Sequence, residues 1–474
     1  MSVDATTIAR VRTRYRKTQA RWGFSWALWC AILWGAWYIP GTAIFYEDPI
    51  AGLSGNNGEI ILGALIVSML NAVAVLVAMF FWLVVLGKTR EYVATIRRPR
   101  ISAWYIPAGF CGFMAIIGIY LAITFVGPAF GSVAGLLFPL AGVTIARLWL
   151  KERITLRGAT GILVMVCGAF IVFVPGLWEQ LTTPGDNAWI GYVGGLLTII
   201  GFGAEGAVAG RALDVSDPEI GATLRFTAEL GLWLLVLFPL MLLIWGYAAL
   251  DALVVAVTNP TILFLLVPLG LTYGYCYLTW YKSFPLIGVG PGQAIATLSG
   301  PIAIILLWIF SVSVIGWNVV LGCVIAVAGS FVLFSERSSG AATLRHEHVP
   351  HPEPPAVTGV SQKHQPELAA GERTKPRHLK GIALEELARR GPLWDYEIVD
   401  TVMDEHGVSG RYWAGTVRAT LTDLFAGGLI AEVGVDVDPA RSFGEEKILH
   451  RFELTDFGRL RMRQAGLREG NASA

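Results

Sequence analysis

Glu205 is the residue of this sequence with the clearest capacity for chemistry. It lies in the segment GFGAEGAVAG, well inside a stretch that is otherwise apolar. A charged side chain at the centre of a bilayer costs about 2.5–3.5 kcal/mol on insertion scales, and acids retained there usually have a function. Apolar surroundings disfavour the charged form of a carboxyl group, which suits a group that must take up and release a proton. Glu205 is therefore the predicted proton-coupling residue.

Structural interpretations of Glu205 stay open at this point. Its side chain could extend toward the membrane face near Arg211, or it could form a permanent ion pair with Lys282 or Arg225 and act as a gate or packing element. Arg225 and Glu229 are one helical turn apart, a spacing that favours an ion pair on one helix face. Together, Glu205, Lys282, Arg225 and Glu229 form the predicted coupling or gating set.

Aromatic side chains recur where they could line a cavity for an organic molecule. They follow helical spacing at Tyr273, Tyr277, Trp280 and Tyr281, and they cluster at Trp34, Trp37 and Tyr38. The structural alternatives are an interfacial belt for the aromatics and helix bridging for the amides at mid-stretch. The predicted substrate contacts are Trp37, Tyr38, Asn71, Tyr120, Tyr273, Tyr277 and Gln293. Such a lining suits an amphipathic or cationic organic compound better than a bare inorganic ion.

Patterns typical of hydrolytic, redox or metal chemistry are missing from the sequence. It contains no phosphate-binding glycine loop, nucleotide-hydrolysis signature or catalytic triad. The five Cys are isolated from one another, and all seven His lie beyond residue 345. The segment HEHVPH could bind a metal only if a scaffold held it in place. We therefore expect no enzyme activity, no cofactor and no metal site.

Ten apolar stretches must position these residues. The chain has 474 residues, of which 54% are hydrophobic and only 15% charged, with a mean hydropathy of +0.59. This composition excludes an ordinary soluble globular protein. A stretch of about 20 apolar residues crosses a bilayer, and it must do so as a helix. The predicted spans are 22–46, 61–87, 103–126, 129–150, 157–177, 189–210, 226–249, 261–282, 288–311 and 315–335.

The basic residues predict the orientation of these spans. All 18 Lys and Arg before residue 337 lie in every second connection, starting with the basic segment 1–21. Lys and Arg are retained on the cytoplasmic side of a membrane. The sequence therefore predicts a multi-pass protein of the plasma (inner) membrane, with residues 1–21 and the C-terminus in the cytoplasm.

An internal repeat relates the two halves of the apolar region. GLLFPLA (135–141) matches TLSGPIA (297–303), and GILVMVCG (161–168) matches GCVIAVAG (322–329). The offset corresponds to five helices, an odd number, so the second copy would be inverted in the membrane. Inverted repeats with a binding site at their interface are typical of transporters. The predicted repeats are 22–178 and 187–335.

Several motifs in this region resemble those of the EamA-type drug/metabolite transporter superfamily. They are Trp34-Gly35, Phe138-Pro139 and the segment LKERIT (150–155) followed by Gly158. The resemblance covers about residues 22–335 and implies ten helices that transport small molecules, in many members driven by a proton or by exchange. One departure is that the second repeat reads WIFSVSVI (308–315), without a Glu-Arg pair.

The C-terminal part has a different composition. Residues 336–378 read as a disordered linker, and residues 379–470 regain globular patterning. Three segments there, GPLWDYEI (391–398), LTDLFAGGLI (421–430) and FELTDFGR (452–459), resemble PadR-like winged-helix regulators. This resemblance implies three helices, a two-stranded wing and a closing helix of about 455–468 through which such domains dimerise, so a homodimer is plausible.

The charge of the C-terminal part bears on what it binds. Residues 379–474 carry 12 basic and 16 acidic residues, and DNA binding depends on neutralising phosphates. A regulatory or protein-binding module is therefore favoured over a DNA reader.

The sequence thus predicts an all-α polytopic membrane protein with a small soluble α+β winged-helix domain. Its expected function is secondary transport, as an exporter, of a small organic metabolite or drug, with protons as a candidate coupling ion. The expected partners are that substrate and the lipid bilayer. The alternative is a membrane-tethered, ligand-sensing transcription regulator.

Overall fold

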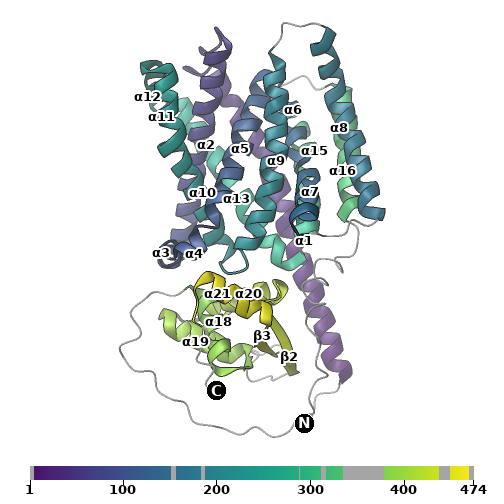
Figure 1. The fold of residues 1–474 in the computed structure, drawn as a ribbon, viewed down its shortest axis with the longest axis vertical. Coiled ribbons are helices and arrows are strands. Elements are labelled where there is room, and N and C mark those ends of the chain that lie inside the picture. The colour runs from purple at the N-terminus through teal and green to yellow at the C-terminus, as the bar shows by residue number, and fades with distance from the viewer. Residues whose placement is uncertain are drawn as a thin grey trace.

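A long helical bundle and a smaller α+β unit at one of its ends make up the computed structural model (Figure 1). The structure describes residues 5–150, 156–182, 187–287, 289–310, 316–334, 378–436 and 449–468. The predicted linker, HEHVPH and most of the predicted wing turn lie outside these residues. We call residues 378–468 the C-terminal domain and the end of the bundle next to it the domain-facing end.

Helices make up the bundle throughout its described length. The first half contains α1 (Ala5–Ala43), η1 (Ile44–Tyr46), α2 (Asn57–Val85), α3 (Thr89–Ile96), α4 (Pro99–Ser102), α5 (Tyr105–Phe125), α6 (Pro128–Leu136), α7 (Phe138–Leu150) and α8 (Leu156–Thr182). The second half contains α9 (Ala188–Ala212), α10 (Pro218–Leu232), the π-helical turn η2 (Trp233–Leu237), α11 (Phe238–Trp245), α12 (Tyr247–Thr258), α13 (Pro260–Ile287), α14 (Val289–Ala296), α15 (Ser299–Ile309) and α16 (Trp317–Phe334). The described residues of each of the ten predicted apolar ranges are therefore mainly helical.

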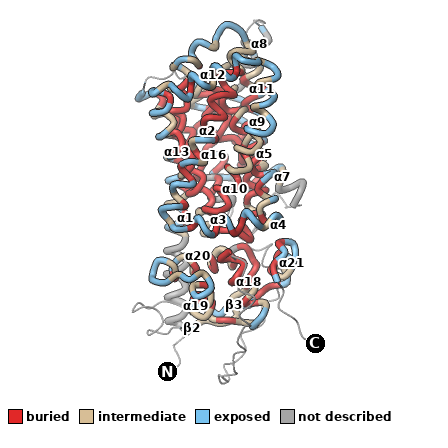
Figure 2. The backbone as a smooth tube through the Cα atoms, turned by 90° about the vertical axis from the view of Figure 1, so that its left-hand side faces the viewer, coloured by how far each residue is buried: buried red, intermediate tan, exposed pale blue. Residues whose placement is uncertain are grey.

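Several of these helices are suited to a bilayer. Within the described residues, six are long and apolar enough to cross a membrane: Ala20–Tyr46, Asn57–Val85, Pro99–Phe125, Ala188–Gly210, Pro218–Trp245 and Pro260–Phe284. Large apolar side chains such as Leu243 and Trp317 are more than four-fifths exposed on the outside of the bundle, while the interior is buried (Figure 2). Exposed apolar surface of this kind marks a surface made for another apolar phase. The bundle has the character of an all-α membrane protein.

Three of the predicted spans are interrupted rather than continuous. In the range 226–249, Gly246, at φ +58°, separates α11 from α12. The other two breaks lie nearer mid-span. The range 129–150 is divided at Leu137 into α6 and α7, and the range 288–311 is divided at 297–298 into α14 and α15. Pro139 and Pro301 fall in the first turn of the helix that follows each break. Proline is tolerated there because its missing N–H has no helical partner, whereas in a helix interior it clashes with the preceding turn. These two mid-span breaks lie at matching places of the internal repeat.

The packing of the helices follows the same repeat. α5 packs on α9 as α13 packs on α1, and α7 packs on α9 as α15 packs on α1. α8 packs along α16, and there the repeated glycines of the sequence face one another. A Cβ on Gly168 would lie 2.7 Å from the carbonyl oxygen of Gly322, and one on Gly329 would lie 2.5 Å from the backbone nitrogen of Met165. The two helices therefore run antiparallel, with their backbones in close approach.

The C-terminal domain contains helices and a small sheet. Its elements are α18 (Leu379–Arg390), β1 (Leu393–Trp394), α19 (Asp395–His406), α20 (Arg411–Ala426), β2 (Ile430–Asp436), β3 (Leu449–Leu454) and α21 (Asp456–Ala465). The antiparallel sheet has the order β1-β3-β2. Within GPLWDYEI (391–398), the short strand β1 precedes α19, with Leu393 opposite Phe452. Apolar residues of α18, α19 and α20 form the core, including Ile382, Ile398 and Leu421.

Candidate functional site

Three charged residues meet inside the bundle without solvent exposure. Glu205 comes from α9, and Arg225 and Glu229 come from successive turns of α10. Arg225 Nε donates to Glu205 Oε1 at 2.6 Å, and Nη2 donates to Oε2 at 3.2 Å. The Nη1 atom donates to Glu229 Oε2. All three side chains are 0% exposed, so one guanidinium is shared by two buried carboxylates. We call these residues the triad.

Tyrosines of α13 complete the surroundings of Glu205. The Tyr277 hydroxyl donates to Glu205 Oε2 at 2.9 Å, and the Tyr281 hydroxyl lies 3.5 Å from Oε1. Arg225 Nη2 also donates to the Tyr277 oxygen at 3.3 Å. The guanidinium carbon lies 4.0 Å from the centre of the Phe226 ring and 4.6 Å from that of Tyr277, a cation–π arrangement. With both acids ionised, the triad would carry one net negative charge among aromatic rings.

A cluster of aromatic residues adjoins the triad through Tyr277. Trp37 stacks on Tyr273 with ring centres 4.9 Å apart and meets the edge of Tyr120 at 5.5 Å. Trp37 Nε1 donates to Asn71 Oδ1 at 2.9 Å. The Tyr273 hydroxyl lies 3.5 Å from that of Tyr277. We call Trp37, Asn71, Tyr120, Tyr273 and Tyr277 the aromatic box; these predicted substrate contacts from four helices lie together.

Two polar atoms of the aromatic box have no hydrogen-bond partner among the described residues. They are Asn71 Nδ2 and the Tyr120 hydroxyl oxygen, and both are buried. A buried polar group that is left unpaired costs about 1–3 kcal/mol, because it has given up its bonds to water. A donor and a hydroxyl kept in this condition are suited to binding a polar group of a ligand.

The other predicted contacts lie at the edge of this site. Tyr38 touches Trp37, with ring centres 4.9 Å apart, and its hydroxyl donates to the Gly131 carbonyl at 3.3 Å. Gln293 is buried on α14 against α9, where a Cβ on Gly206 would lie 2.5 Å from its amide nitrogen. Gln293 therefore lies against the residue next to Glu205 in the chain and is not part of the aromatic box.

Lys282 does not join the triad. Its ammonium lies 2.8 Å from Glu219 Oε1 at the domain-facing end and 5.2 Å from the ring centre of Trp26. Of the two ion pairs considered for Glu205, the structure contains the one with Arg225.

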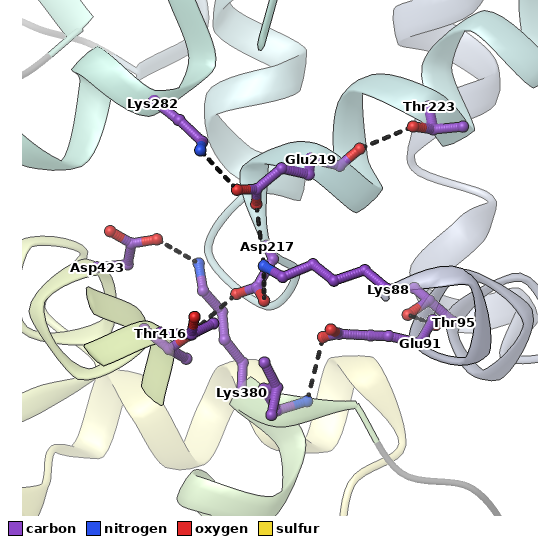
Figure 3. Close-up of polar contacts among 12 residues, drawn as sticks. Lys88, Glu91, Thr95, Asp217, Glu219, Thr223, Lys282, Lys380, Thr416 and Asp423 are labelled. Carbon is purple, nitrogen blue, oxygen red and sulfur yellow. Dashed lines mark hydrogen bonds and ion pairs between the residues drawn. The ribbon is translucent and has the colours of Figure 1, made fainter. Parts of the chain in front are cut away.

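A second charged cluster lies at the domain-facing end (Figure 3). Lys88 Nζ is 3.3 Å from Glu219 Oε2 and 3.6 Å from Asp217 Oδ2, and all three side chains are buried. Burial lowers the pKa of Lys88, but the carboxylates of Glu219 and Asp217 outweigh it and hold that pKa above its usual range. Lys88 is therefore a permanent cation that holds the two acids.

The predicted site residues left out several residues of these two sites, including Trp34, which was named only in the aromatic cluster with Trp37 and Tyr38. Trp34 packs against the rings of Phe138, Phe202 and Trp280 beside the aromatic box. Its position one turn before Trp37 was a usable signal. The acids of the segment DVSDPE (214–219) were also missed, although three acids in six residues form an uncommon cluster in this chain. Among the described residues, no group of three or more His, Cys, Asp or Glu could hold a metal ion.

Comparisons with known proteins give little beyond this geometry. No protein-family model and no curated protein matches the chain. The chain is similar to a solved structure titled "Crystal structure of protein", with 16% sequence identity and a TM-score of 0.42. The similarity covers 65% of this chain and 95% of the chain in that structure.

Proposed function

We propose that this protein is a secondary transporter that exports a small organic molecule across the plasma (inner) membrane. The observation that carries the proposal is the triad, a shared arginine between two buried carboxylates, in contact with the aromatic box. Buried ionisable residues in membrane helices mark substrate or ion pathways and proton relays. Among the described residues, no metal-binding cluster offers a different chemistry.

The proposed architecture is ten crossings in two inverted five-helix repeats, 22–178 and 187–335, with both ends of the chain in the cytoplasm. It is supported by helices in all ten predicted ranges, by the exchanged pairing of α5 with α9 and α13 with α1, and by the antiparallel contact of α8 with α16. In such transporters the substrate lies between the repeats. α1 and α5 belong to the first repeat and α9, α10 and α13 to the second, so the site draws on both.

The proposed mechanism is competition for Glu205. In the geometry observed, Arg225 and the Tyr277 hydroxyl occupy both of its carboxylate oxygens. A proton arriving on Glu205 would remove one of the two charges that hold the guanidinium and would free the Tyr277 hydroxyl to bond within the aromatic box. A cationic or amphipathic substrate, stacked on Trp37 and Tyr273, would then meet a changed set of hydrogen-bonding groups. Proton binding and substrate binding are coupled because both act on the same carboxylate.

The motifs Trp34-Gly35, Phe138-Pro139 and LKERIT are the basis for placing this region near the EamA-type transporters. The C-terminal domain is proposed to be a winged helix that regulates the transporter. Three helices, the antiparallel pair of β2 with β3 and the closing helix α21 support this proposal.

Transport in reconstituted vesicles tests the proposal. A thermal-shift screen of metabolites and drugs on the purified full chain identifies compounds, which are then followed across vesicles with and without a pH gradient. We expect at least one stabilising compound to move against its gradient when protons move with theirs. The proposal fails if every stabilising compound stays outside the vesicles under both conditions.

The second candidate function, a membrane-tethered transcription regulator, is favoured by the fold of the C-terminal domain alone. It predicts salt-sensitive, sequence-selective binding of duplex DNA by the full chain. Such binding, together with a ligand response and no transport, would favour this function instead.

A further inference from the structure

The C-terminal domain contacts the connection between α9 and α10, residues 213–217. Lys380 Nζ donates to the Leu213 carbonyl at 2.7 Å, and the Thr420 hydroxyl donates to Asp217 Oδ1 at 3.3 Å. Arg461 Nε lies 3.4 Å from Asp214 Oδ2. Lys380, Thr420 and Arg461 are each at most 3% exposed, and together they form what we call the docking surface. Figure 3 shows Lys380 beside Asp217 and the bundle lysine Lys88.

Apolar packing surrounds these polar contacts. Ile101 of α4 and Val215 of the connection belong to the same buried apolar cluster as Leu379 and Leu421 of the domain. The Arg461 guanidinium carbon lies 5.9 Å from the ring centre of Trp104. Ion pairs on a protein surface contribute little, but pairs that are buried and hydrogen-bonded are costly to break. This contact therefore has the construction of a specific interface.

The charges of the two sides are complementary. The connection and the start of α10 carry Asp214, Asp217 and Glu219, and the bundle itself neutralises only part of this charge through Lys88 and Lys282. The docking surface supplies two further cations, Lys380 and Arg461, and Lys380 also lies 3.6 Å from Asp423 Oδ2 of the domain itself. The C-terminal part is acidic overall, yet it places these two cations against the connection. The docking surface therefore matches the α9–α10 connection by its local charge, whereas the net charge of the domain is negative.

Only about two helical turns separate the connection from the triad along each of the two helices. Glu205 precedes Leu213 by eight residues on α9, and Arg225 follows Asp217 by eight residues on α10, so each is about 12 Å along its helix from the connection. α13 is joined to the start of α10 as well. Lys282, which follows Tyr277 by five residues on α13, pairs with Glu219. A helix transmits a displacement along its axis, so these three helices link the docking surface to the triad.

We propose that the C-terminal domain is a clamp whose docking surface holds the α9–α10 connection and thereby keeps Glu205 paired with Arg225. Its partner is a segment of this same chain. Release of the domain loosens the ends of α9 and α10 and frees the triad to change partners. The consequence for transport rests on the proposed function, but the clamp itself can be measured without a transported compound.

Hydrogen exchange of the full chain in lipid nanodiscs tests the clamp. Thr420→Glu places a carboxylate beside Asp217, and Lys380→Glu removes the bond to Leu213 and adds repulsion. We expect amide exchange in residues 206–224 to rise by about tenfold or more in both variants, because these amides would open locally. Ala419→Glu is the matched control: it adds the same charge one residue away, at an exposed position of α20, and should leave this exchange unchanged.

Protection of the core amides of α18 and α19 shows in the same experiment that the domain remains folded. A second measurement uses Thr420→Cys with Asp217→Cys in a cysteine-free background, where we expect an oxidised cross-link that slows exchange in 206–224. The control pair Ala419→Cys with Asp217→Cys should not cross-link.

The clamp is refuted if exchange in 206–224 is the same in Thr420→Glu, Lys380→Glu and the control while the domain core stays protected. It is equally refuted if the Thr420–Asp217 cysteine pair fails to cross-link in the full chain, or if it cross-links only between two copies. Failure of transport in vesicles with a positive exchange result would refute the proposed function and leave the clamp in place.

Discussion

Arg225→Met provides the sharpest test of the triad. Methionine keeps much of the apolar stem of arginine but removes the charge and the hydrogen bonds to Glu205, Glu229 and Tyr277. Two carboxylates would then lie beside each other in a site with no exposure. Breaking a buried ion pair by removing one partner destabilises by about 3–5 kcal/mol, because the other charge is left without compensation.

The loss should depend on pH. Without the guanidinium, protonation is the remaining way to neutralise the two carboxylates, so the variant should lose less stability under acidic than under alkaline conditions. The wild-type triad, in which the guanidinium bonds both carboxylates, should respond less over the same range. The assay is thermal unfolding of the purified protein followed by the fluorescence of its 17 Trp.

A double-mutant cycle separates charge from packing. Adding Glu205→Gln to Arg225→Met removes one of the stranded charges, so we expect it to recover about 1 kcal/mol or more of the loss, as residues in direct contact do in such cycles. Arg157→Met, at an exposed position of α8, is the control and should behave as wild type. Unchanged unfolding of Arg225→Met at both pH extremes would show that the buried charges do not interact as described.

Three further predictions follow from the same geometry. Glu205→Gln imitates the protonated state, so transport should lose its pH dependence; an unaltered pH profile excludes proton coupling through this residue. Trp37→Ala and Tyr277→Ala should weaken binding of a ligand found by thermal shift by about tenfold or more, since each removes a desolvated aromatic contact, whereas Tyr247→Ala, 89% exposed on the outside, should not; equal affinities in all three would show that the box is not the binding site. Burial lowers the pKa of His378 from 6.5 to about 3, helped by the nearby charge of Arg98. Below about pH 6.5 the unfolded chain therefore binds a proton that the folded chain does not, and domain stability should fall as pH drops from 6.5 toward 3. His378→Gln should flatten this decline in an acid titration followed by hydrogen exchange, and an equally steep decline in the variant contradicts the assignment.

The sequence by itself determined where the helices of this protein lie. In the part of the chain that the structure describes, all ten apolar ranges are mainly helical, because a long run of apolar residues can satisfy its backbone groups in hydrocarbon only as a helix. In the C-terminal part, the closing helix expected at about 455–468 corresponds to α21, Asp456–Ala465. The sequence indicated the breaks at Leu137 and at 297–298 only in part. Pro139 and Pro301 marked their places, but they did not show that each range divides into two helices.

Only the tertiary structure decided which side chains meet. Glu205 could have paired with Lys282 or Arg225, and both choices satisfied the sequence, because an apolar stretch specifies a helix without specifying its rotation against its neighbours. The folded arrangement of α9, α10 and α13 brings Glu205 to Arg225 and Tyr277 and pairs Lys282 with Glu219. Lys380 and Thr420 contact the α9–α10 connection although they are more than 160 positions away in the chain. The folded shapes of the bundle and the C-terminal domain bring them together, and no local sequence pattern indicates this contact.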